Sequence, residues 1–159
     1  VIELGAGAGH NLADLRKLYP TADLTGVEIN PEAYKRMLVH ADQGLCASLL
    51  DITPIIKYDL VLTKGVLIHV HPEDIEKAYE IIYRLAGHWI LLAEYYNPKP
   101  VEVEYRGHAG KLFKRDFAGE MLDRYPDLQL VDYGFKYHRD KYPQDDVTWF
   151  LMEKQTCHI

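Results

Sequence analysis

The sequence predicts an α/β fold in which a mostly parallel central sheet ends in an antiparallel strand pair. Short apolar segments alternate with amphipathic ones up to Ala93, which is typical of parallel strands joined by covering helices. A glycine-rich loop, Gly5 to Gly9, directly follows the first apolar segment. The last two apolar segments, 128–133 and 147–153, have no helical pattern between them.

The first two strand–helix units are recognised by apolar spacing and by residues typical of helix starts. Residues 1–4 form an apolar strand interrupted only by Glu3, and residues 11–19 carry leucines at helical spacing before a proline. Residues 23–29 predict the second strand. The Asn-Pro-Glu that follows combines a cap, a first-turn proline and an acid favoured by the helix dipole. We therefore expect a helix from there to about His40.

The next units complete the expected parallel sheet. A short third strand is expected at residues 45–47, and residues 58–63, rich in Leu and Val, predict a buried fourth strand. A helix begins in the His-Pro-Glu-Asp at 71–74, carries one apolar stripe and is expected to stop at Gly87. Residues 89–93 predict a fifth buried strand.

The remainder of the chain breaks this alternation. Residues 94–111 are expected to form a long polar and aromatic loop, followed by a helix at 116–124. Residues 128–133 and 147–153 then predict two strands that pair antiparallel. The chain has 159 residues, enough for one domain and too few for two, so we expect residues 1–159 to form a single domain.

Composition excludes several classes of partner. The net charge of −6 argues against nucleic acid or an anionic membrane as the general partner. The longest apolar stretch, residues 89–93, is far shorter than the ~20 residues of a membrane helix, so no membrane segment is expected. Cys46, expected in a buried strand, and Cys157 do not suggest a disulfide framework, which favours the cytoplasm. The sequence does not indicate an oligomeric state.

The glycine loop and two acids predict a binding site for S-adenosylmethionine. Gly5 and Gly7 let the backbone approach a ligand, and His10 occupies the position at which a dinucleotide site requires its third glycine. Glu3 can hold an ammonium group, whereas it would disfavour a pyrophosphate. Glu28 is placed to accept from both ribose hydroxyls. The alternatives are a simple tight turn for the glycines and a solvated strand end for Glu28.

Further cofactor contacts are expected where the second, third and fourth strands end. Ile29 is placed to pack on adenine, and Ser48 and Leu49 are placed to contact its edge. Thr63 and Lys64 are placed to hold the methionine end through backbone groups. The predicted cofactor set is Glu3, Gly5, Ala6, Gly7, Glu28, Ile29, Ser48, Leu49, Thr63 and Lys64, with Asp51 as an alternative reader of adenine.

The segment after the fifth strand predicts the reacting groups. Glu94 is followed by Tyr95, Tyr96 and Asn97, and these polar groups are costly in a core and useful in a site. Glu94 is the first candidate for a general base, with the tyrosines lining the cavity or, alternatively, covering the core. His69 is the second candidate, the alternative being a histidine packed against the sheet. The His-x-His that begins there lacks a third ligand, so no metal is expected.

A basic cluster within an acidic protein predicts an anionic acceptor. Arginine can bind a carboxylate or phosphate with paired hydrogen bonds. The alternative is a solvated loop and helix start, although basic residues at a helix start oppose the dipole. We therefore expect a small anionic substrate, and no nucleic acid. The residues of the cluster are Arg106, His108, Lys111, Lys114 and Arg115.

The motifs resemble those of class I S-adenosylmethionine-dependent methyltransferases: Glu-Leu-Gly-Ala-Gly at 3–7, Gly-Val-Glu at 26–28, and Tyr-Asp-Leu-Val at 58–61 leading to Val-Leu-Ile-His at 66–69. More narrowly, the chain is similar to the pseudaminic acid biosynthesis-associated methylases in segments 24–31, 65–69, 94–98, 105–108, 112–117 and 145–150. The resemblance implies a Rossmann-like fold, with S-adenosylmethionine as cofactor and S-adenosylhomocysteine as product.

The same resemblance implies an acceptor and a departure from the family pattern. The acceptor it implies is a hydroxyl of a nonulosonic-acid sugar of bacterial surface glycans, or of its nucleotide-linked form. Class I methyltransferases usually carry a covering helix before the first strand, and residues 1–159 are expected to lack it. The alternatives are another acceptor (small molecule, protein, nucleic acid or lipid), a catalytically silent cofactor-binding module, and a nicotinamide-dependent oxidoreductase.

Overall fold

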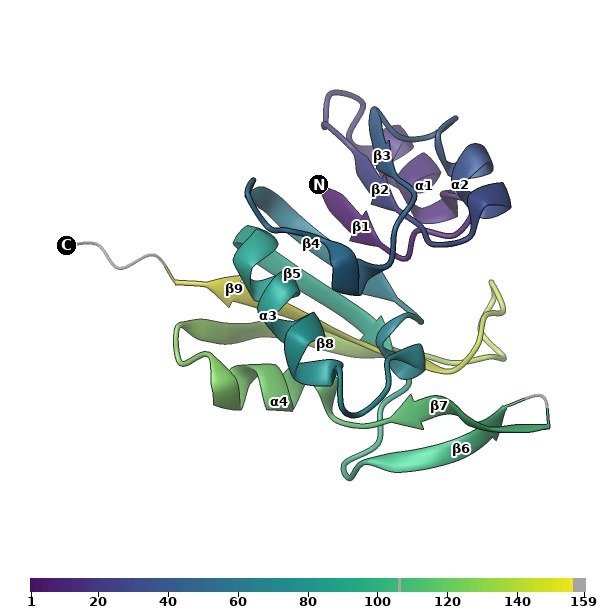
Figure 1. The fold of residues 1–159 in the computed structure, drawn as a ribbon, viewed down its shortest axis with the longest axis vertical. Helices are drawn as coiled ribbons and strands as arrows, with labels where there is room; N and C mark the ends of the chain where they lie inside the picture. Colours follow the sequence, from purple (N-terminus) through teal and green to yellow (C-terminus); the bar gives the residue numbers. More distant parts are fainter. Residues whose placement is uncertain (106, 156–159) are drawn as a thin grey trace.

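The structure, a computed structural model, describes residues 1–105 and 107–155 (Figure 1). Within these ranges, no helix has both the length and the apolar character needed to cross a membrane. The elements in chain order are β1 (Ile2–Leu4), α1 (His10–Leu18), β2 (Thr25–Val27), α2 (Pro31–Met37), β3 (Gln43–Leu45), η1 (Leu49–Asp51), β4 (Tyr58–Lys64), η2 (Leu67–His69), α3 (Ile75–Leu85), β5 (Ala86–Glu94), β6 (Val101–Tyr105), β7 (His108–Lys114), α4 (Phe117–Arg124), β8 (Leu128–Lys136) and β9 (Val147–Lys154).

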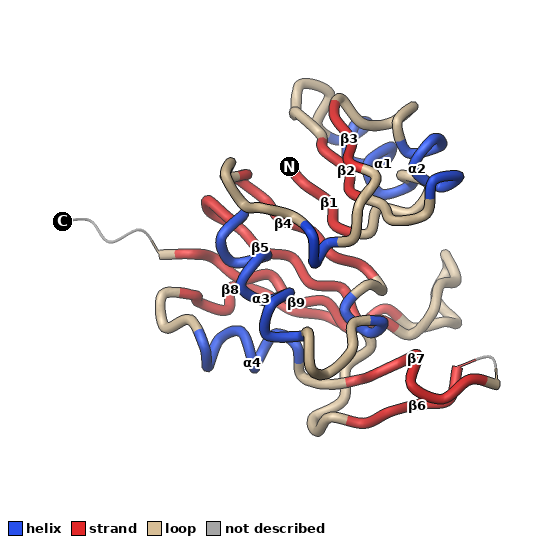
Figure 2. The backbone as a smooth tube through the Cα atoms, in the orientation of Figure 1, coloured by secondary structure: helices blue, strands red, loops and turns tan. Residues whose placement is uncertain are grey.

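Seven strands form one sheet in the order β3-β2-β1-β4-β5-β9-β8 (Figure 2). Neighbouring strands from β3 to β5 are parallel, whereas β9 pairs antiparallel with both β5 and β8. The predicted fold class, a mostly parallel sheet with a terminal antiparallel pair, is confirmed. The strand order reverses between β1 and β4, and in such sheets ligands bind beside the carboxyl ends of the strands at this point.

Helices cover both faces of the sheet, and alternation along the strands decides which layer each side chain meets. Ile2 and Leu4 of β1 belong to the main core, which also contains the buried residues of α3 and α4. Gly26 of β2 is the register partner of Glu3, and a β-carbon there would overlap Met37 Sδ of α2. Because successive residues of a strand point to opposite faces, Glu3 is directed toward the layer formed by α1 and α2.

Residues 94–111 contain two strands that the sequence pattern did not reveal, so the expected long loop is wrong. β6 and β7 form a separate antiparallel pair, visible below the main sheet in Figure 1. Val101 and Val103 alternate with glutamates, and Val103 pairs with Leu112 of β7. Since β7 packs against η2, the β6–β7 hairpin lies over the loop that follows β4.

Three local expectations differ from the structure. α3 ends at Leu85 and β5 begins at the next residue, so Gly87 lies inside a strand and does not stop the helix. α2 ends at Met37, short of His40. β3 is an edge strand that ends one residue before Cys46, so this cysteine is exposed instead of buried.

The face that carries α1 and α2 is apolar beyond these helices as well. A groove of about 580 Å³ lies beside α1, and its apolar lining includes Leu62, Leu91, Trp149 and Leu151. Lys64, at the end of β4, lines both this groove and a pocket at the carboxyl end of the sheet. Its side chain therefore marks the border between the two.

Candidate functional site

The loop between β1 and α1 presents exposed backbone at the carboxyl end of the sheet. Gly5 and Gly7 have φ angles of +69° and +55°, in the left-handed region that glycine adopts without steric cost. A β-carbon on Gly5 would overlap Val66 Cγ2, so this glycine lets the loops after β1 and β4 touch. A β-carbon on Gly7 would meet nothing within 4 Å. Ala6, between them, is buried, so the backbone at Gly7 is the part of the loop that a ligand can approach.

Glu3 is a buried carboxyl with one unused oxygen. Its exposed fraction is 1%, and Oε1 accepts a hydrogen bond of 2.6 Å from Asn11 Nδ2. Oε2 is buried and has no hydrogen-bond partner within residues 1–105 and 107–155. Burial raises the pKa of Glu3 to about 7, although Asn11 and the charge of Lys64 favour the ionised form. A buried oxygen without a donor is unfavourable, so the site fits a ligand that brings an ammonium group.

Glu28 holds the glycine loop at the end of β2. Its Oε2 accepts from Gly7 N and its Oε1 from Asn30 N, both at 2.8 Å. The exposed fraction of Glu28 is 9%, so it is not a solvated strand-end acid. A carboxylate has about four acceptor positions, so Glu28 can still accept hydrogen bonds from ligand hydroxyls.

A pocket of about 340 Å³ lies beside Gly5 and the ends of β2 and β3. Ile29, Ser48 and Leu49, the residues expected around adenine, all line it, whereas Asp51 does not. Ile29 is 67% exposed. An exposed isoleucine in a pocket offers apolar surface to a flat ring. The structure thus brings together three predicted residues from two segments, one after β2 and one after β3.

A second pocket, of about 660 Å³, lies where β4 and β5 end. Its lining includes Lys64 and His69 after β4, Tyr95 after β5, Tyr105 of β6, and Asp145. His69 also lines the 340 Å³ pocket and is the residue that the two pockets share. His69 therefore borders both pockets.

The imidazole of His69 is oriented by the β6–β7 hairpin. Its Nδ1 lies 2.8 Å from the carbonyl oxygen of Lys111, and its ring centre lies 5.5 Å from that of Tyr105. Because a carbonyl can only accept, this hydrogen bond assigns the proton to Nδ1 and the lone pair to Nε2. His69 is exposed, so the interpretation as a core-packed histidine does not hold. It presents a basic nitrogen at the site.

Glu94, the first candidate for a base, is fully engaged inside the protein. Its Oε1 accepts from Thr63 Oγ1 at 2.9 Å, and its two oxygens lie 3.1 and 3.2 Å from Val66 N. Burial raises the pKa of Glu94 to about 7, opposed by the hydrogen bonds from Thr63 and from the backbone of residues 66–68. Glu94 lines neither the 340 Å³ nor the 660 Å³ pocket. Its position suits an anchor for the loop that carries His69.

The three residues that follow Glu94 contact different parts of the protein. Tyr95 lines the larger pocket, and its hydroxyl donates to Asp145 Oδ2 at 2.6 Å. Burial and this carboxylate raise the pKa of Tyr95. The Tyr96 ring lies 5.9 Å from the ring of Phe150 on β9. Asn97 donates to a backbone carbonyl two residues later. Tyr95 is therefore the residue of this segment that reaches the pocket.

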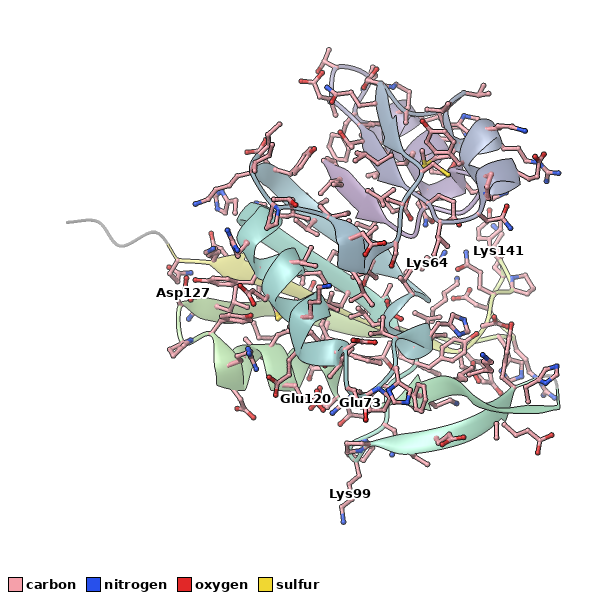
Figure 3. The ribbon with its side chains drawn as sticks, in the orientation of Figure 1. Lys64, Glu73, Lys99, Glu120, Asp127 and Lys141 are labelled. Atoms are coloured by element: carbon pink, nitrogen blue, oxygen red, sulfur yellow. The ribbon has the colours of Figure 1, made fainter. Side chains whose placement is uncertain are left out.

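Among the described residues of the expected basic cluster, Lys114 and Arg115 contact different parts of the protein. Arg115 pairs with Glu120 of α4 at 2.8 Å, and Figure 3 shows Glu120 far from Lys64. Lys114 Nζ lies 5.3 Å from the centre of the Tyr95 ring, beside the larger pocket. His108 is exposed on β7, and Arg106 lies outside the described residues.

Several site residues were missed from the sequence. Asn11 lies in the first turn after the glycine loop, so its spacing from Glu3 was an available signal. Gln144 and Asp145 come from the segment between β8 and β9, and no local pattern predicts that this segment returns to β4 and β5. Tyr105 belongs to the hairpin that was expected to be a loop.

The chain matches a known protein family in sequence, and it resembles solved structures in fold. The methyltransferase domain family matches residues 2–88. No curated protein sequence matches significantly. Magnesium protoporphyrin IX methyltransferase from Synechocystis PCC 6803 with bound SAM is 17% identical, with 97% of this chain and 69% of that chain covered and a TM-score of 0.68.

Two further solved structures show the same similarity. 1,6-didemethyltoxoflavin-N1-methyltransferase from Burkholderia thailandensis is 15% identical, with 98% of this chain and 70% of that chain covered and a TM-score of 0.75. The N-methyltransferase NodS from Bradyrhizobium japonicum is 16% identical, with 98% of this chain and 85% of that chain covered and a TM-score of 0.71. These likenesses confirm the Rossmann-like fold.

Proposed function

The chain belongs to the methyltransferase domain family, and on that premise we propose that it transfers the methyl group of S-adenosylmethionine to a small acceptor in the 660 Å³ pocket. The observation that carries this proposal is the position of His69. It lines both pockets, and the hydrogen bond from its Nδ1 to the Lys111 carbonyl leaves the lone pair on Nε2. A cofactor in one pocket and an acceptor in the other would thus share one basic group.

The residues of the smaller pocket and the glycine loop suit S-adenosylmethionine. Glu3 would hold the ammonium group, because its buried Oε2 receives no hydrogen bond from the described residues. Glu28 would accept from the ribose hydroxyls while it holds the loop at Gly7. Ile29 and Ser48 would enclose adenine in the 340 Å³ pocket. The chemistry of each group thus matches one part of the cofactor.

His69 supplies the proton acceptor that methylation of a hydroxyl requires. When bound, S-adenosylmethionine supplies a methyl group on a positively charged sulfur, and S-adenosylhomocysteine is the product. A hydroxyl loses its proton as the new bond to carbon forms. His69 Nε2 accepts this proton, and the hydrogen bond from Nδ1 to the Lys111 carbonyl stabilises the imidazolium. Glu94 acts as a positioning residue, because it binds the loop that leads to His69.

We infer that the acceptor is a small anionic molecule, a hydroxyl-bearing nonulosonic acid or its nucleotide-linked form. The resemblance to the pseudaminic acid-associated methylases favours this class. The pocket volume of about 660 Å³ suits a small molecule, and Lys114 adds positive charge beside Tyr95. In this proposal, residues 1–159 act as a single domain in the cytoplasm.

Calorimetry with S-adenosylhomocysteine tests cofactor binding. The wild-type protein is expected to bind one equivalent, and Glu28→Ala is expected to weaken binding at least about tenfold, since it removes charged acceptors. The matched control is Glu32→Ala on α2, where the side chain is 74% exposed and pairs with Lys35. The control is expected to bind like the wild type. Absence of binding by the wild-type protein would refute the proposal.

A methyl-transfer assay on a panel of nonulosonic acids and their nucleotide-linked forms tests the role of His69. His69→Asn is expected to reduce the rate about a hundredfold or more, with S-adenosylhomocysteine affinity unchanged. The matched control is His88→Asn, at the other end of β5, where the imidazole pairs with Glu153. A full rate for His69→Asn would exclude it as the base. Transfer to none of the panel would exclude this acceptor class.

A further inference from the structure

We propose, building on the function above, that the Lys64 ammonium binds the carboxylate of the cofactor's methionyl group. Glu3, Asn11 and Lys64 would then form one receptor for an α-amino acid, in which the acid takes the ammonium and the lysine takes the carboxylate. The sequence had suggested only backbone contacts for Lys64. Its side chain would make the protein discriminate cofactors that have a carboxylate from those that do not.

The geometry that carries the proposal is a chain of contacts across β1 and β4. These strands are adjacent and parallel; Glu3 is the central residue of β1, and Lys64 is the last residue of β4. Asn11 Nδ2 donates to Glu3 Oε1 at 2.6 Å, and Lys64 Nζ donates to Asn11 Oδ1 at 3.4 Å. The amide of Asn11 thus separates an acid from a base. Figure 3 shows Lys64 on the side of the molecule where Lys141, from the segment between β8 and β9, also lies.

Within residues 1–105 and 107–155, Lys64 has no charged partner of its own. Its second hydrogen bond, of 3.1 Å, goes to Oε1 of Gln144, which is neutral. It forms no ion pair with any carboxylate among the described residues, in contrast to Lys17 and Lys35. Hydrogen bonds between an ammonium and a carboxylate are about twice as strong as neutral ones. A ligand carboxylate therefore gains more from Lys64 than either amide does.

The unused oxygen of Glu3 completes the match. In the part of the chain that the structure describes, Oε2 of Glu3 receives no hydrogen bond and Lys64 forms no ion pair. A methionyl group carries an ammonium and a carboxylate on the same carbon, so one ligand can satisfy both. Lys64 is hydrogen-bonded to Asn11, and Asn11 is hydrogen-bonded to Glu3. These bonds place Lys64 on the side of the 660 Å³ pocket that is nearer the proposed cofactor site.

Three ligands separate the contributions in calorimetry: S-adenosylhomocysteine, its decarboxylated form, which keeps the amine, and 5′-methylthioadenosine, which lacks both groups. The wild-type protein is expected to bind S-adenosylhomocysteine about tenfold to a hundredfold more tightly than the decarboxylated form. Lys64→Met is expected to abolish this preference and to weaken binding of S-adenosylhomocysteine far more than binding of the decarboxylated form. Lys64→Arg is expected to retain a preference for the carboxylate. Lys17→Met, an exposed control on α1, is expected to behave as wild type.

The inference is overturned if the wild-type protein binds S-adenosylhomocysteine and its decarboxylated form equally. It is also overturned if Lys64→Met weakens both ligands by the same factor, in which case Lys64 serves the fold or the acceptor. The comparison of ligands on wild-type protein needs no variant, so a folding defect in Lys64→Met does not remove the test. Binding of none of the three ligands would instead refute the methyltransferase proposal itself.

Discussion

Replacing Glu3 by Gln is expected to stabilise the cofactor-free protein above neutral pH while it weakens binding of S-adenosylhomocysteine. Glu3 is buried, and one of its oxygens has no donor among the described residues. Glutamine has nearly the same shape, keeps an oxygen for the hydrogen bond from Asn11, and carries no charge. The variant therefore removes a buried charge whose Oε2 receives no hydrogen bond from the described residues.

The magnitude follows from the raised pKa of Glu3, about 7 in the folded protein against an ordinary value of 4.5. Between these two values the unfolded chain has lost its proton while the folded protein still holds it. Stability therefore falls as the pH rises through this window, and the full cost is present above a pH of about 7. At about 1.4 kcal/mol for each pKa unit, the cost is roughly 3 kcal/mol. In a domain of this size that corresponds to a Tm change of about 6–12 °C.

Thermal unfolding of both proteins, with and without S-adenosylhomocysteine, provides the assay. At a pH of about 8 the Tm of Glu3→Gln is expected to exceed that of the wild type, and at a pH of about 5 the two are expected to agree closely. S-adenosylhomocysteine is expected to raise the Tm of the wild type much more than the Tm of Glu3→Gln, because the stabilisation by a ligand increases with its affinity. A lower Tm for Glu3→Gln at a pH of about 8, or equal ligand-induced shifts, would refute the reasoning.

Four further substitutions test the site. Gly5→Ala is expected to cost about 3 kcal/mol of unfolding free energy in chemical denaturation, and Gly7→Ala about 1 kcal/mol, because both have positive φ and only the first β-carbon would overlap a neighbour. Glu94→Gln is expected to destabilise by about 1–3 kcal/mol in the same assay, because the new amide donor would oppose the backbone and hydroxyl donors that Glu94 now accepts; unchanged stability would contradict its anchoring role. Tyr95→Phe is expected to accelerate amide hydrogen exchange in residues 137–146 and not in β5, because the 2.6 Å bond to the next segment is lost.

The fold was largely predictable because its signals are local. The expected cap at Asn30 is confirmed, since its side chain accepts from the backbone nitrogens of Glu32 and Ala33. The apolar segments of the parallel strands are confirmed as strands at nearly the expected positions. β6 was missed because its alternation of valine and glutamate extends over only five residues and was not distinguished from a polar loop. Short strands without a buried face give a weak pattern.

Site residues could be predicted where their spacing along the sequence fixes their place near the glycine loop. They were harder to predict where the direction of the side chain decides whether a residue faces the site. Glu3 belongs to the same short segment as the glycines, so sequence alone indicated its place. Glu94 and Tyr95 are neighbours at a strand end, yet one is buried beneath the site and the other lines it. Lys114 and Arg115 likewise contact different parts of the protein. Neighbouring residues of extended backbone point to opposite sides, and the sequence does not say which side faces the ligand.

The insertion of β9 between β5 and β8 has a consequence for synthesis of the chain. The ribosome releases β8 before β9, yet β8 makes no pairs with β5 and depends on β9 for its place in the sheet. Until residues 147–154 emerge, the backbone groups along one side of β5 have no strand to bind, which is the kind of edge that attracts other chains. A nascent or prematurely terminated chain lacking this segment is therefore expected to need chaperone protection, even though its first five strands are already complete.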